Sequence, residues 1–388
     1  MNLLIYSHFF SPSIGGVENI VQSLATGIAK LRNINGDREF HVTLATGIPA
    51  GSTDDKQFPF EIIRQPNFLT LWRLIRHADV VHLAGPALLP MLLAWISRKK
   101  YVIEHHGYQA ICPNGLLVQH PARSICPGYF QAARYGECFK CLHSEFSSRR
   151  VAAQLLLLMF PRYWLARDAR KNIAVTHHVA QRQKLPRTEV VYHGIEDPLP
   201  GERESTSLPA ARLCIACVGR LVPEKGIPVL LEAARLLKLE GRDFEIRLIG
   251  DGSERPRLEG FIQRENLQSC VFITGFLSSD ALAAALRDVN VVVMPSTWEE
   301  TAGLAAIEQM MRGRLVVAAD IGGLREVVGD TGMKFLPGDG ASLAHCLRNI
   351  ITNPVLVTIL GQAARERALN LFNWPSMIAN HAQIYRSQ

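Results

Sequence analysis

The chain has 388 residues, 48% of them hydrophobic and 20% charged, which is typical of a globular protein with two domains rather than one. It has no uncharged apolar run of the roughly 18 residues that a membrane-spanning helix needs, and its N-terminus lacks the features of a secretory signal, so we expect a cytoplasmic protein. The formal net charge of +7 favours anionic partners, and eight cysteines in a reducing compartment argue against a disulfide framework.

The first half of the chain alternates between strand-like and helix-like segments. A strand over residues 3–7 leads through Gly15-Gly16 into an amphipathic helix over residues 17–31, and paired glycines at such a turn let the backbone approach a ligand closely. The pair lacks the spacing of a dinucleotide site, so NAD binding is not expected. The alternation predicts a doubly wound, mainly parallel sheet. Further strands are expected at residues 40–46, 61–65, 80–83, 101–104, 172–175 and 190–192, with helices at 69–76 and 88–96.

Two histidines stand where one of these strands ends, in the sequence Glu104-His105-His106-Gly107. Open α/β sheets bind ligands at the carboxyl ends of their strands, which makes His106 a candidate site residue. A purely structural histidine is the alternative.

Residues 108–145 break the rhythm and contain four cysteines without clear periodicity. Cys138 and Cys141 have the spacing that lets two thiolates reach one zinc ion, and Cys112 and Cys126 could complete a tetrahedral set. We therefore expect a structural zinc on these four residues, with buried thiols or a disulfide formed only on oxidation as the alternatives.

An apolar helix with basic flanks is expected at residues 151–164. Six basic residues and one acid, Asp168, lie between residues 149 and 171, which leaves that segment with a charge of six minus one, or +5. Such a helix suits the interface of an anionic membrane, whereas the alternative is a buried helix with solvated basic ends.

A second alternation follows a Pro-, Ser- and Glu-rich linker at residues 196–210. Its first strand, residues 212–218, runs into Gly219-Arg220 and then Lys225-Gly226, before a helix at residues 227–239. Two cations beside the N-terminus of a helix suit a pyrophosphate. Further strands are expected at 245–249, 271–274, 291–294 and 315–318, and C-terminal helices at 341–350 and 374–386.

The stretch MPSTWEETAGLAAIEQMM, which starts at Met294, reads as a strand, a polar loop and a helix that begins after Gly303. It carries two carboxylates eight positions apart, Glu300 in the loop and Glu308 in the helix. They are candidates for contact with a ligand; alternatively they merely favour the helix start and solvate its surface. Gly322-Gly323 predicts another close approach of the backbone.

These motifs, in this order and over nearly the whole chain, resemble those of the retaining GT-B glycosyltransferases of family 4, the glycosyl transferases group 1. The resemblance implies two Rossmann-like domains that face each other across a cleft. The N-terminal, acceptor-side domain would comprise residues 1–195, with the cysteine insertion at 108–145 and a C-terminal helix, 372–388, packed back on it; the nucleotide-sugar domain would comprise residues 196–371.

The resemblance also implies roles for single residues. Arg220 and Lys225 would hold the donor diphosphate, and His106 and Glu300 would lie at the reacting sugar. Glu308 would bind the nucleotide ribose. The donor would further contact Gly16, Gly219, Ala302, Gly303 and Leu304. Ala302 stands where the family commonly has Phe, which changes the expected shape of the sugar pocket.

We therefore expect a hexosyltransferase that acts with retention, without a catalytic cofactor or metal. It would take a UDP- or GDP-sugar and a glycan or lipid-linked acceptor, in polysaccharide or lipopolysaccharide synthesis on the inner face of the membrane. The alternatives are a sugar-nucleotide epimerase on the same frame and a non-catalytic, membrane-associated sugar-nucleotide-binding protein. Binding of nucleic acid is not expected, because the basic residues are not interleaved with aromatic residues in one stripe.

Overall fold

The computed structural model describes residues 1–388 except 14, 52 and 200–211. The chain forms two units: unit 1 comprises Met1–Gly194 and Trp374–Gln388, and unit 2 comprises Ile195–Asn373. The expected boundaries, after residues 195 and 371, differ from these by one and two residues. Residues 200–210 of the expected linker lie outside the described residues. The cleft between the two domains stays a prediction.

Unit 1 is built on a seven-stranded, fully parallel sheet with the order β3-β2-β1-β4-β5-β8-β9. Helices connect the strands, as the alternation predicts, because a parallel pair needs a crossover connection. The strands are β1 (Asn2–Ser7), β2 (His41–Thr46), β3 (Glu61–Arg64), β4 (Val80–Ala84), β5 (Lys100–His105), β8 (Lys171–Ala174) and β9 (Thr188–Val190). The helices of this layer are α1 (Gly16–Lys30), α2 (Phe68–His77), α3 (Leu88–Ile96) and α6 (His177–Gln183).

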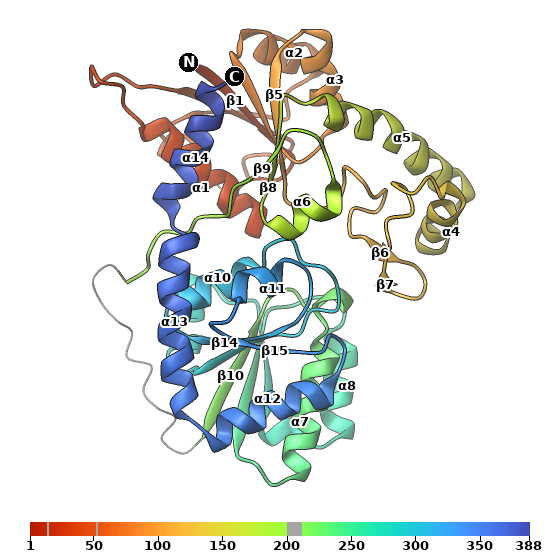
Figure 1. Ribbon diagram of the computed structural model, residues 1–388, viewed down its shortest axis with the longest axis vertical. Helices are drawn as coiled ribbons and strands as arrows, with labels where there is room; N and C mark the ends of the chain where they lie inside the picture. The colour runs from red at the N-terminus through yellow and green to blue at the C-terminus, as the bar shows by residue number, and fades with distance from the viewer. Residues whose placement is uncertain (14, 52, 200–211) are drawn as a thin grey trace. The chain divides into compact units, whose positions relative to one another are not determined.

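The C-terminal helix α14 (Trp374–Arg386) belongs to unit 1 and packs beside α1 (Figure 1). The indole of Trp374 donates to the carbonyl oxygen of Ser23 at 3.4 Å, and Arg386 pairs with Glu39 at 2.6 Å. Along the buried face of the helix, the Tyr385 hydroxyl lies 3.0 Å from Nδ1 of His82 on β4. The last residues of the chain thus complete the N-terminal core.

Residues 108–145 are more regular than the sequence predicts. They contain a two-stranded antiparallel ribbon, β6 (Val118–Gln119) and β7 (Ser124–Ile125), and most of the helix α4 (Tyr135–Phe146). The expectation of a segment without secondary structure is wrong, because α4 buries only Cys138 and Leu142 and so shows little apolar periodicity. Phe130, Cys138 and Met159 form a small core between this segment and the next helix.

That next helix, α5 (Arg149–Asp168), is longer than predicted and begins at an N-cap, where the Ser148 hydroxyl accepts a hydrogen bond from the amide of Val151. Its buried residues are only Ala152, Met159, Leu165 and Ala166, so α5 lies on the surface and the alternative of a buried core helix is wrong. No single described helix has the length and apolar character to cross a membrane, although the sharply bent pair Gly340–Thr352 and Val355–Leu371 meets the criterion by length and composition.

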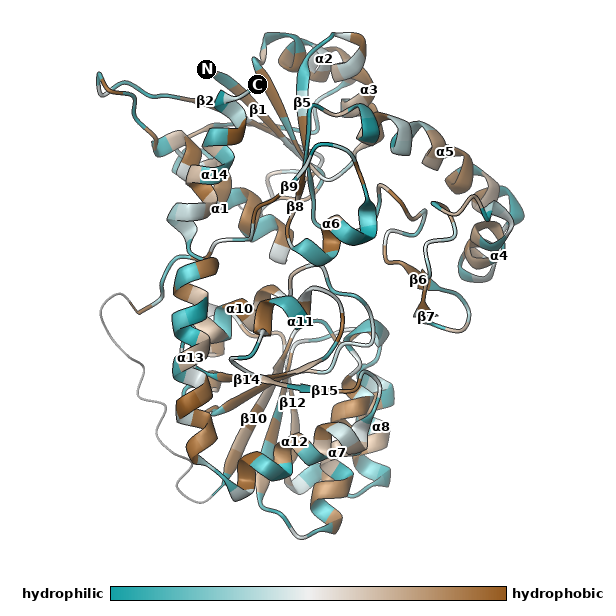
Figure 2. Ribbon diagram, in the orientation of Figure 1, coloured by the Kyte–Doolittle hydropathy of each residue, from teal (hydrophilic) through white to brown (hydrophobic). Residues whose placement is uncertain are grey.

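Unit 2 repeats the plan with a six-stranded parallel sheet in the order β12-β11-β10-β13-β14-β15. Figure 2 shows the apolar strands of this sheet among helices with mixed surfaces. The strands are β10 (Leu213–Val218), β11 (Phe244–Ile249), β12 (Val271–Gly275), β13 (Val291–Met294), β14 (Leu315–Ala319) and β15 (Met333–Phe335). The helices are α7 (Ile227–Leu239), α8 (Arg255–Arg264), α9 (Ser279–Leu286), α10 (Leu304–Met311), α11 (Gly322–Val328), α12 (Gly340–Thr352) and α13 (Val355–Leu371).

Candidate functional site

The strand order of unit 2 places its main candidate site between β10 and β13. β10 lies between β11 and β13, so the chain leaves β10 toward one side of the sheet and β13 toward the other. Loops diverge at such a switch point and leave room for a ligand at the carboxyl ends of the strands. A small pocket is present there, and its lining includes Gly219, Arg220, Lys225, Pro295 and Ser296.

Gly226 brings the loops after β10 and β13 into contact. Its φ of 64° lies in the left-handed region, and a Cβ atom at this position would run into the carbonyl oxygen of Pro295. A glycine here therefore allows the short helical turn η2 (Pro223–Lys225) to pack directly on the loop after β13. The helix α7 starts at the next residue, so its unpaired backbone N–H groups face the same region.

An ion pair links the two loops. Nζ of Lys225 lies 2.9 Å from Oε1 of Glu300, and the hydroxyl of Ser296 donates a short hydrogen bond to the same oxygen. The Glu300 side chain is 6% exposed and that of Lys225 is 25% exposed, so both ends of the pair are largely shielded from water. Ser296 fixes the carboxylate, which leaves two of the three ammonium hydrogens of Lys225 available to another acceptor.

Arg220 lies in the loop after β10, which also carries Lys225, and its side chain is exposed. Among the residues that the structure describes, no carboxylate lies within ion-pair distance of it. An unpaired guanidinium beside the start of α7 is suited to a phosphate group, as the sequence predicts.

Glu308 lies on the helix α10, which follows the loop after β13. Burial raises the pKa of the Glu308 carboxyl, and the charge of Arg312 only partly opposes this. In the described part of the chain no side chain forms a hydrogen bond or ion pair with it. Gly303, with a φ of 72°, precedes α10, and its neighbour Ala302 is buried.

The predicted close approach at Gly322-Gly323 is real, and its partner is the loop after β13. The amide of Gly323 donates to the carbonyl oxygen of Glu300 at 2.6 Å, and a Cβ atom on Gly322 would lie 2.7 Å from Cα of Glu299. The start of α11 thus supports the backbone of the loop that carries Glu300.

The other two predicted residues, Gly16 and His106, lie in unit 1. Gly16 is the first residue of α1, and His106 follows β5, where its side chain is 6% exposed. Nδ1 of His106 lies 3.1 Å from Nε2 of His193, and the two rings stack at a centroid distance of 5.2 Å. Both rings approach the fully buried carboxylate of Glu104.

Ionisation differs sharply among the groups around Glu104. Burial opposes its charge, but the nearby His106 and His381 outweigh burial and hold the pKa of the Glu104 carboxyl well below its usual range. Burial lowers the pKa of His193 to about 3, whereas the charge of Glu104 overcomes burial and raises the pKa of His381. The pKa values of the imidazoles around one buried carboxylate thus shift in opposite directions.

The four cysteines of the insertion are reduced, and three of them, Cys112, Cys126 and Cys138, are buried. Burial raises the pKa of the Cys112 thiol to about 11, and burial with the neighbouring thiols raises that of Cys138 to about 12. Cys141 accepts a hydrogen bond from the amide of His120 at 3.2 Å. Within the described residues, the group of three or more ligands with metal-binding spacing is Glu104, His106 and His193, not the cysteines, and the zinc site on the cysteines stays a prediction.

Sequence reasoning missed the partners of these residues. Ser296 gave no signal beyond its place after a strand, and His82 and His381 lie far from Glu104 in the sequence. His82 is the central residue of the apolar strand β4, and a histidine inside such a strand could have drawn attention to it. The return of α14 to unit 1, which brings His381 to Glu104, has no local signature.

Comparison with known proteins gives the family. The profile described as glycosyl transferases group 1 matches residues 201–367. Glycogen synthase of Mycobacterium tuberculosis is 30% identical over 287 residues, which cover 69% of this chain and 66% of that protein. The 2-deoxystreptamine glucosyltransferase of Streptomyces kanamyceticus is 35% identical over 154 residues, which cover 39% of this chain and 40% of that protein. The match thus spans about two-fifths of that relative's length.

Solved structures show the same fold. Anabaena HepE in complex with UDP and glucose superposes with a TM-score of 0.73 at 20% sequence identity, over 100% of both chains. Sucrose-phosphate synthase from Thermosynechococcus elongatus gives 0.71 at 22% identity, over 100% of this chain and 98% of that one. With two Rossmann-like units and this family's profile, the chain belongs to the glycosyl transferases group 1 and has the GT-B fold.

Proposed function

We propose that this protein is a glycosyltransferase that moves a hexose from a nucleotide-diphosphate sugar to a hydroxyl group of a glycan or lipid-linked glycan, with retention of configuration. The observation that carries the proposal is the arrangement of Arg220, Lys225 and Glu300 at the switch point of unit 2. Several relatives are named as glycosyltransferases, and the related structure of HepE contains UDP and glucose.

In this proposal, the diphosphate binds at Arg220, Lys225 and the start of α7. Negative charge develops on the diphosphate as the bond to the sugar breaks, so these cations stabilise the transition state more than the ground state. Catalysis then needs no metal to neutralise the leaving group.

The ion pair gives Glu300 a second role. Lys225 can turn its remaining hydrogens to a phosphate while Ser296 keeps the carboxylate in place, so that Glu300 accepts a hydrogen bond from a sugar hydroxyl. Ala302, Gly303 and Leu304 would line the sugar site, Glu308 would accept from the ribose hydroxyls, and Gly219 would let the phosphates approach the backbone. His106 and Gly16 are assigned to the acceptor side in unit 1.

Retention is proposed to occur by attack of the acceptor on the same face of the sugar that the diphosphate leaves. A covalent glycosyl-enzyme is less favoured, since the carboxylate of Glu300 is held by Lys225 and Ser296, two residues that line the pocket.

The first experiment is a thermal-shift screen of UDP- and GDP-sugars, since a ligand that binds the native state raises the melting temperature by mass action. The donor that binds is then incubated with candidate acceptors, and the anomeric configuration of the product is determined by NMR. An α-linked donor should give an α-linked product. A β-linked product would overturn retention, and interconversion of the donor without an acceptor would establish the epimerase alternative.

We also propose that unit 1 contacts an anionic membrane surface through α3 and α5. Trp95 on α3 and Trp164 on α5 meet edge to face at 5.1 Å, yet remain 43% and 50% exposed. The two helices carry further exposed apolar side chains, and Figure 2 shows brown segments along both. They are Leu89, Leu92 and Ile96 on α3 and Leu157, Leu158 and Phe160 on α5.

Basic residues flank this apolar surface, including Arg149 and Arg150 at the start of α5 and Arg167 and Arg170 near its end. Exposed tryptophans beside basic side chains suit the boundary between lipid headgroups and acyl chains. A peripheral location at the inner face of the membrane would bring the enzyme to lipid-linked acceptors.

Co-sedimentation with phosphatidylglycerol vesicles at low salt tests the membrane proposal. The double variant Trp95→Ser, Trp164→Ser should lose binding, whereas Phe276→Ser, which replaces an exposed aromatic residue of unit 2, should retain it. Absence of binding by the unaltered protein, or equal binding to neutral phosphatidylcholine vesicles, would contradict it.

A further inference from the structure

A buried carboxylate in unit 1 is surrounded by four imidazole rings. Oε2 of Glu104 lies 3.2 Å from Nε2 of His82 and 3.6 Å from Nε2 of both His106 and His381. Its Oε1 lies 3.8 Å from Nε2 of His193. The rings come from β4, from the segments after β5 and β9, and from α14, so three strands or their following segments and the C-terminal helix converge on one side chain.

Most of these separations are too long for hydrogen bonds, which join nitrogen and oxygen atoms at about 2.7–3.2 Å. Both carboxylate oxygens of Glu104 and the Nε2 atoms of His82 and His381 have no hydrogen-bond partner among the described residues, although all three side chains are fully buried. Buried polar atoms in native proteins nearly always have a hydrogen-bond or ionic partner. We therefore expect a single partner that contacts several of these atoms at once.

The separations match those of ligands around a metal ion. Ligand atoms about 2.1 Å from a tetrahedral metal lie about 3.4 Å from one another. One ligand atom from each of Glu104, His106 and His193 lies within 4.8 Å of the other two. Imidazole and carboxylate donors suit zinc and other first-row transition metals, whereas magnesium and calcium prefer oxygen ligands alone.

Hydrogen bonds orient the two rings, His82 and His381, that flank the carboxylate of Glu104. Nδ1 of His381 lies 2.9 Å from the carbonyl oxygen of Met377, which can only accept, so this nitrogen carries a proton and Nε2 points to the carboxylate. Nδ1 of His82 lies 3.0 Å from the hydroxyl of Tyr385, which can donate or accept, so this contact orients the ring without setting its tautomer. Outer-shell groups of this kind orient the carboxylates that bind metal ions.

We propose that Glu104, His106 and His193 bind one divalent transition-metal ion, zinc being the ion that this donor set fits best, with His82 and His381 orienting Glu104 beside it. The ion would neutralise the buried carboxylate and join the end of β5 to the segment after β9. It would also fix the ring of His106. This site is distinct from the donor site of unit 2, and its role is structural rather than a step of the transfer.

The test is the metal content of the full chain, purified without chelator and without a histidine tag. It is measured for the unaltered protein, for Glu104→Gln, for the double variant Cys138→Ser, Cys141→Ser, and for His41→Ala. His41 is an exposed histidine on β2 and controls for adventitious surface binding. We expect Glu104→Gln to lose one equivalent relative to the unaltered protein and to His41→Ala. The cysteine variant should keep this equivalent.

A second measurement needs no substitution and so does not depend on the folding of a variant. The unaltered chain is stripped with a chelator, and Zn²⁺ is then added; the melting temperature should rise with Zn²⁺ concentration. Co²⁺ in its place should give the absorption of a nitrogen and oxygen site, without a thiolate charge-transfer band.

Less than about a tenth of an equivalent of metal, with no Zn²⁺-dependent rise in melting temperature, would overturn the proposal. His82 and His381, whose Nε2 atoms face the carboxylate, would then be the partners of Glu104. Loss of the ion from the cysteine variant alone would also overturn it and assign the metal to the insertion. Neither result bears on donor binding in unit 2, because the readout is metal content and not transfer.

Discussion

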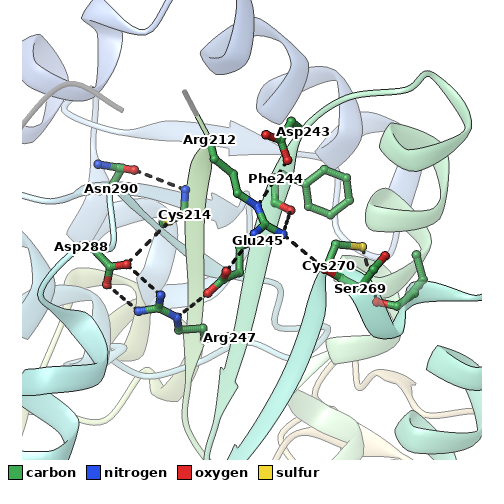
Figure 3. A network of polar contacts seen from close by, with 11 residues as sticks. Arg212, Cys214, Asp243, Phe244, Glu245, Arg247, Ser269, Cys270, Asp288 and Asn290 are labelled. Atoms are coloured by element: carbon green, nitrogen blue, oxygen red, sulfur yellow. Dashed lines mark hydrogen bonds and ion pairs between the residues drawn. The ribbon is translucent and has the colours of Figure 1, made fainter. Parts of the chain in front are cut away.

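The two edges of the sheet in unit 2 carry charge in opposite ways. At the amino ends of the strands, Arg212 pairs with Asp243 and Glu245 at 3.3 and 3.2 Å, and Arg247 pairs with Glu245 and Asp288 at 2.7 and 2.5 Å (Figure 3). Two cations thus meet three carboxylates. At the carboxyl ends beside the pocket, Lys225 pairs with Glu300, whereas Arg220 has no carboxylate within ion-pair distance among the described residues.

This difference separates a structural network from a binding site. The amino-edge pairs satisfy one another and present no excess of positive charge to an anion. At the carboxyl edge, the guanidinium of Arg220 has no acidic partner among the described residues and lies in the loop that leads to α7, where backbone N–H groups favour an anion. Ionic contacts alone do not mark the functional edge; the charge that remains uncompensated does.

The largest expected effect comes from removing the cations beside the pocket. Arg220→Ala or Lys225→Ala should lower turnover on the order of 10²-fold or more, since each removes a preorganised charge from the leaving diphosphate. The matched control, Arg212→Ala at the amino edge, should change kcat/KM less than about twofold. Comparable losses at both edges, or unaltered rates in the first two variants with a donor shown to bind, would refute the distinction.

The close contact of the two loops predicts a stability effect of about 2 kcal/mol or more for Gly226→Ala, because strain at positive φ adds to collision with Pro295. Gly241→Ala is the matched control: its φ of 67° is nearly the same, but no atom lies within 4 Å of a Cβ there, so it should cost only about 1 kcal/mol. Denaturant unfolding of both variants gives the difference. Equal losses would show that backbone strain, not loop contact, selects glycine at position 226.

The pKa values of carboxylates at the two edges are shifted in opposite directions. Hydrogen bonds from Arg247 lower the pKa of Asp288, whereas burial raises that of Glu308. Nucleotide affinity should therefore weaken as the pH falls through the raised pKa of Glu308, because the protonated carboxyl accepts ribose hydroxyls poorly. Glu308→Gln should bind about tenfold more weakly at neutral pH, with a flatter pH profile in calorimetric titrations.

Glu308 also predicts an effect on protein stability, and its direction is opposite to the effect on nucleotide binding. A raised pKa in the folded state means that the ionised Glu308 costs stability, and that this cost grows as the pH rises through that pKa. Glu308→Gln should thus raise the melting temperature of the unliganded protein near neutral pH, while it weakens nucleotide binding. A fall in both would make Glu308 a structural residue.

The smallest effect is expected at the amino edge. Arg247→Ala should lower the free energy of unfolding by about 1 kcal/mol, since its side chain is 20% exposed and its partner Asp288 is 57% exposed, so solvent screens much of the attraction. High salt should shrink the difference, and donor affinity should be unchanged. A loss of donor affinity without loss of stability would show that the amino edge contributes to donor binding.

The sequence by itself determined most of the frame. Alternating apolar strands and helices predicted both parallel sheets, and glycines and cations after the strands at residues 212–218 and 291–294 predicted the loops of the donor site. These signals are local, because periodicity and turn chemistry depend on neighbours within a few residues. The short strand β15 and the helices α8 and α9 were not predicted, since their apolar patterns are short or weak.

Only the tertiary structure decided which distant groups meet. It joined Lys225 to Glu300 across 75 positions, and it brought His381 from the end of the chain to Glu104. It also turned the apolar α5 outward, where the sequence left both a surface helix and a core helix open. Such outcomes depend on strand order and on the return of α14, and no interaction between sequence neighbours encodes either of them.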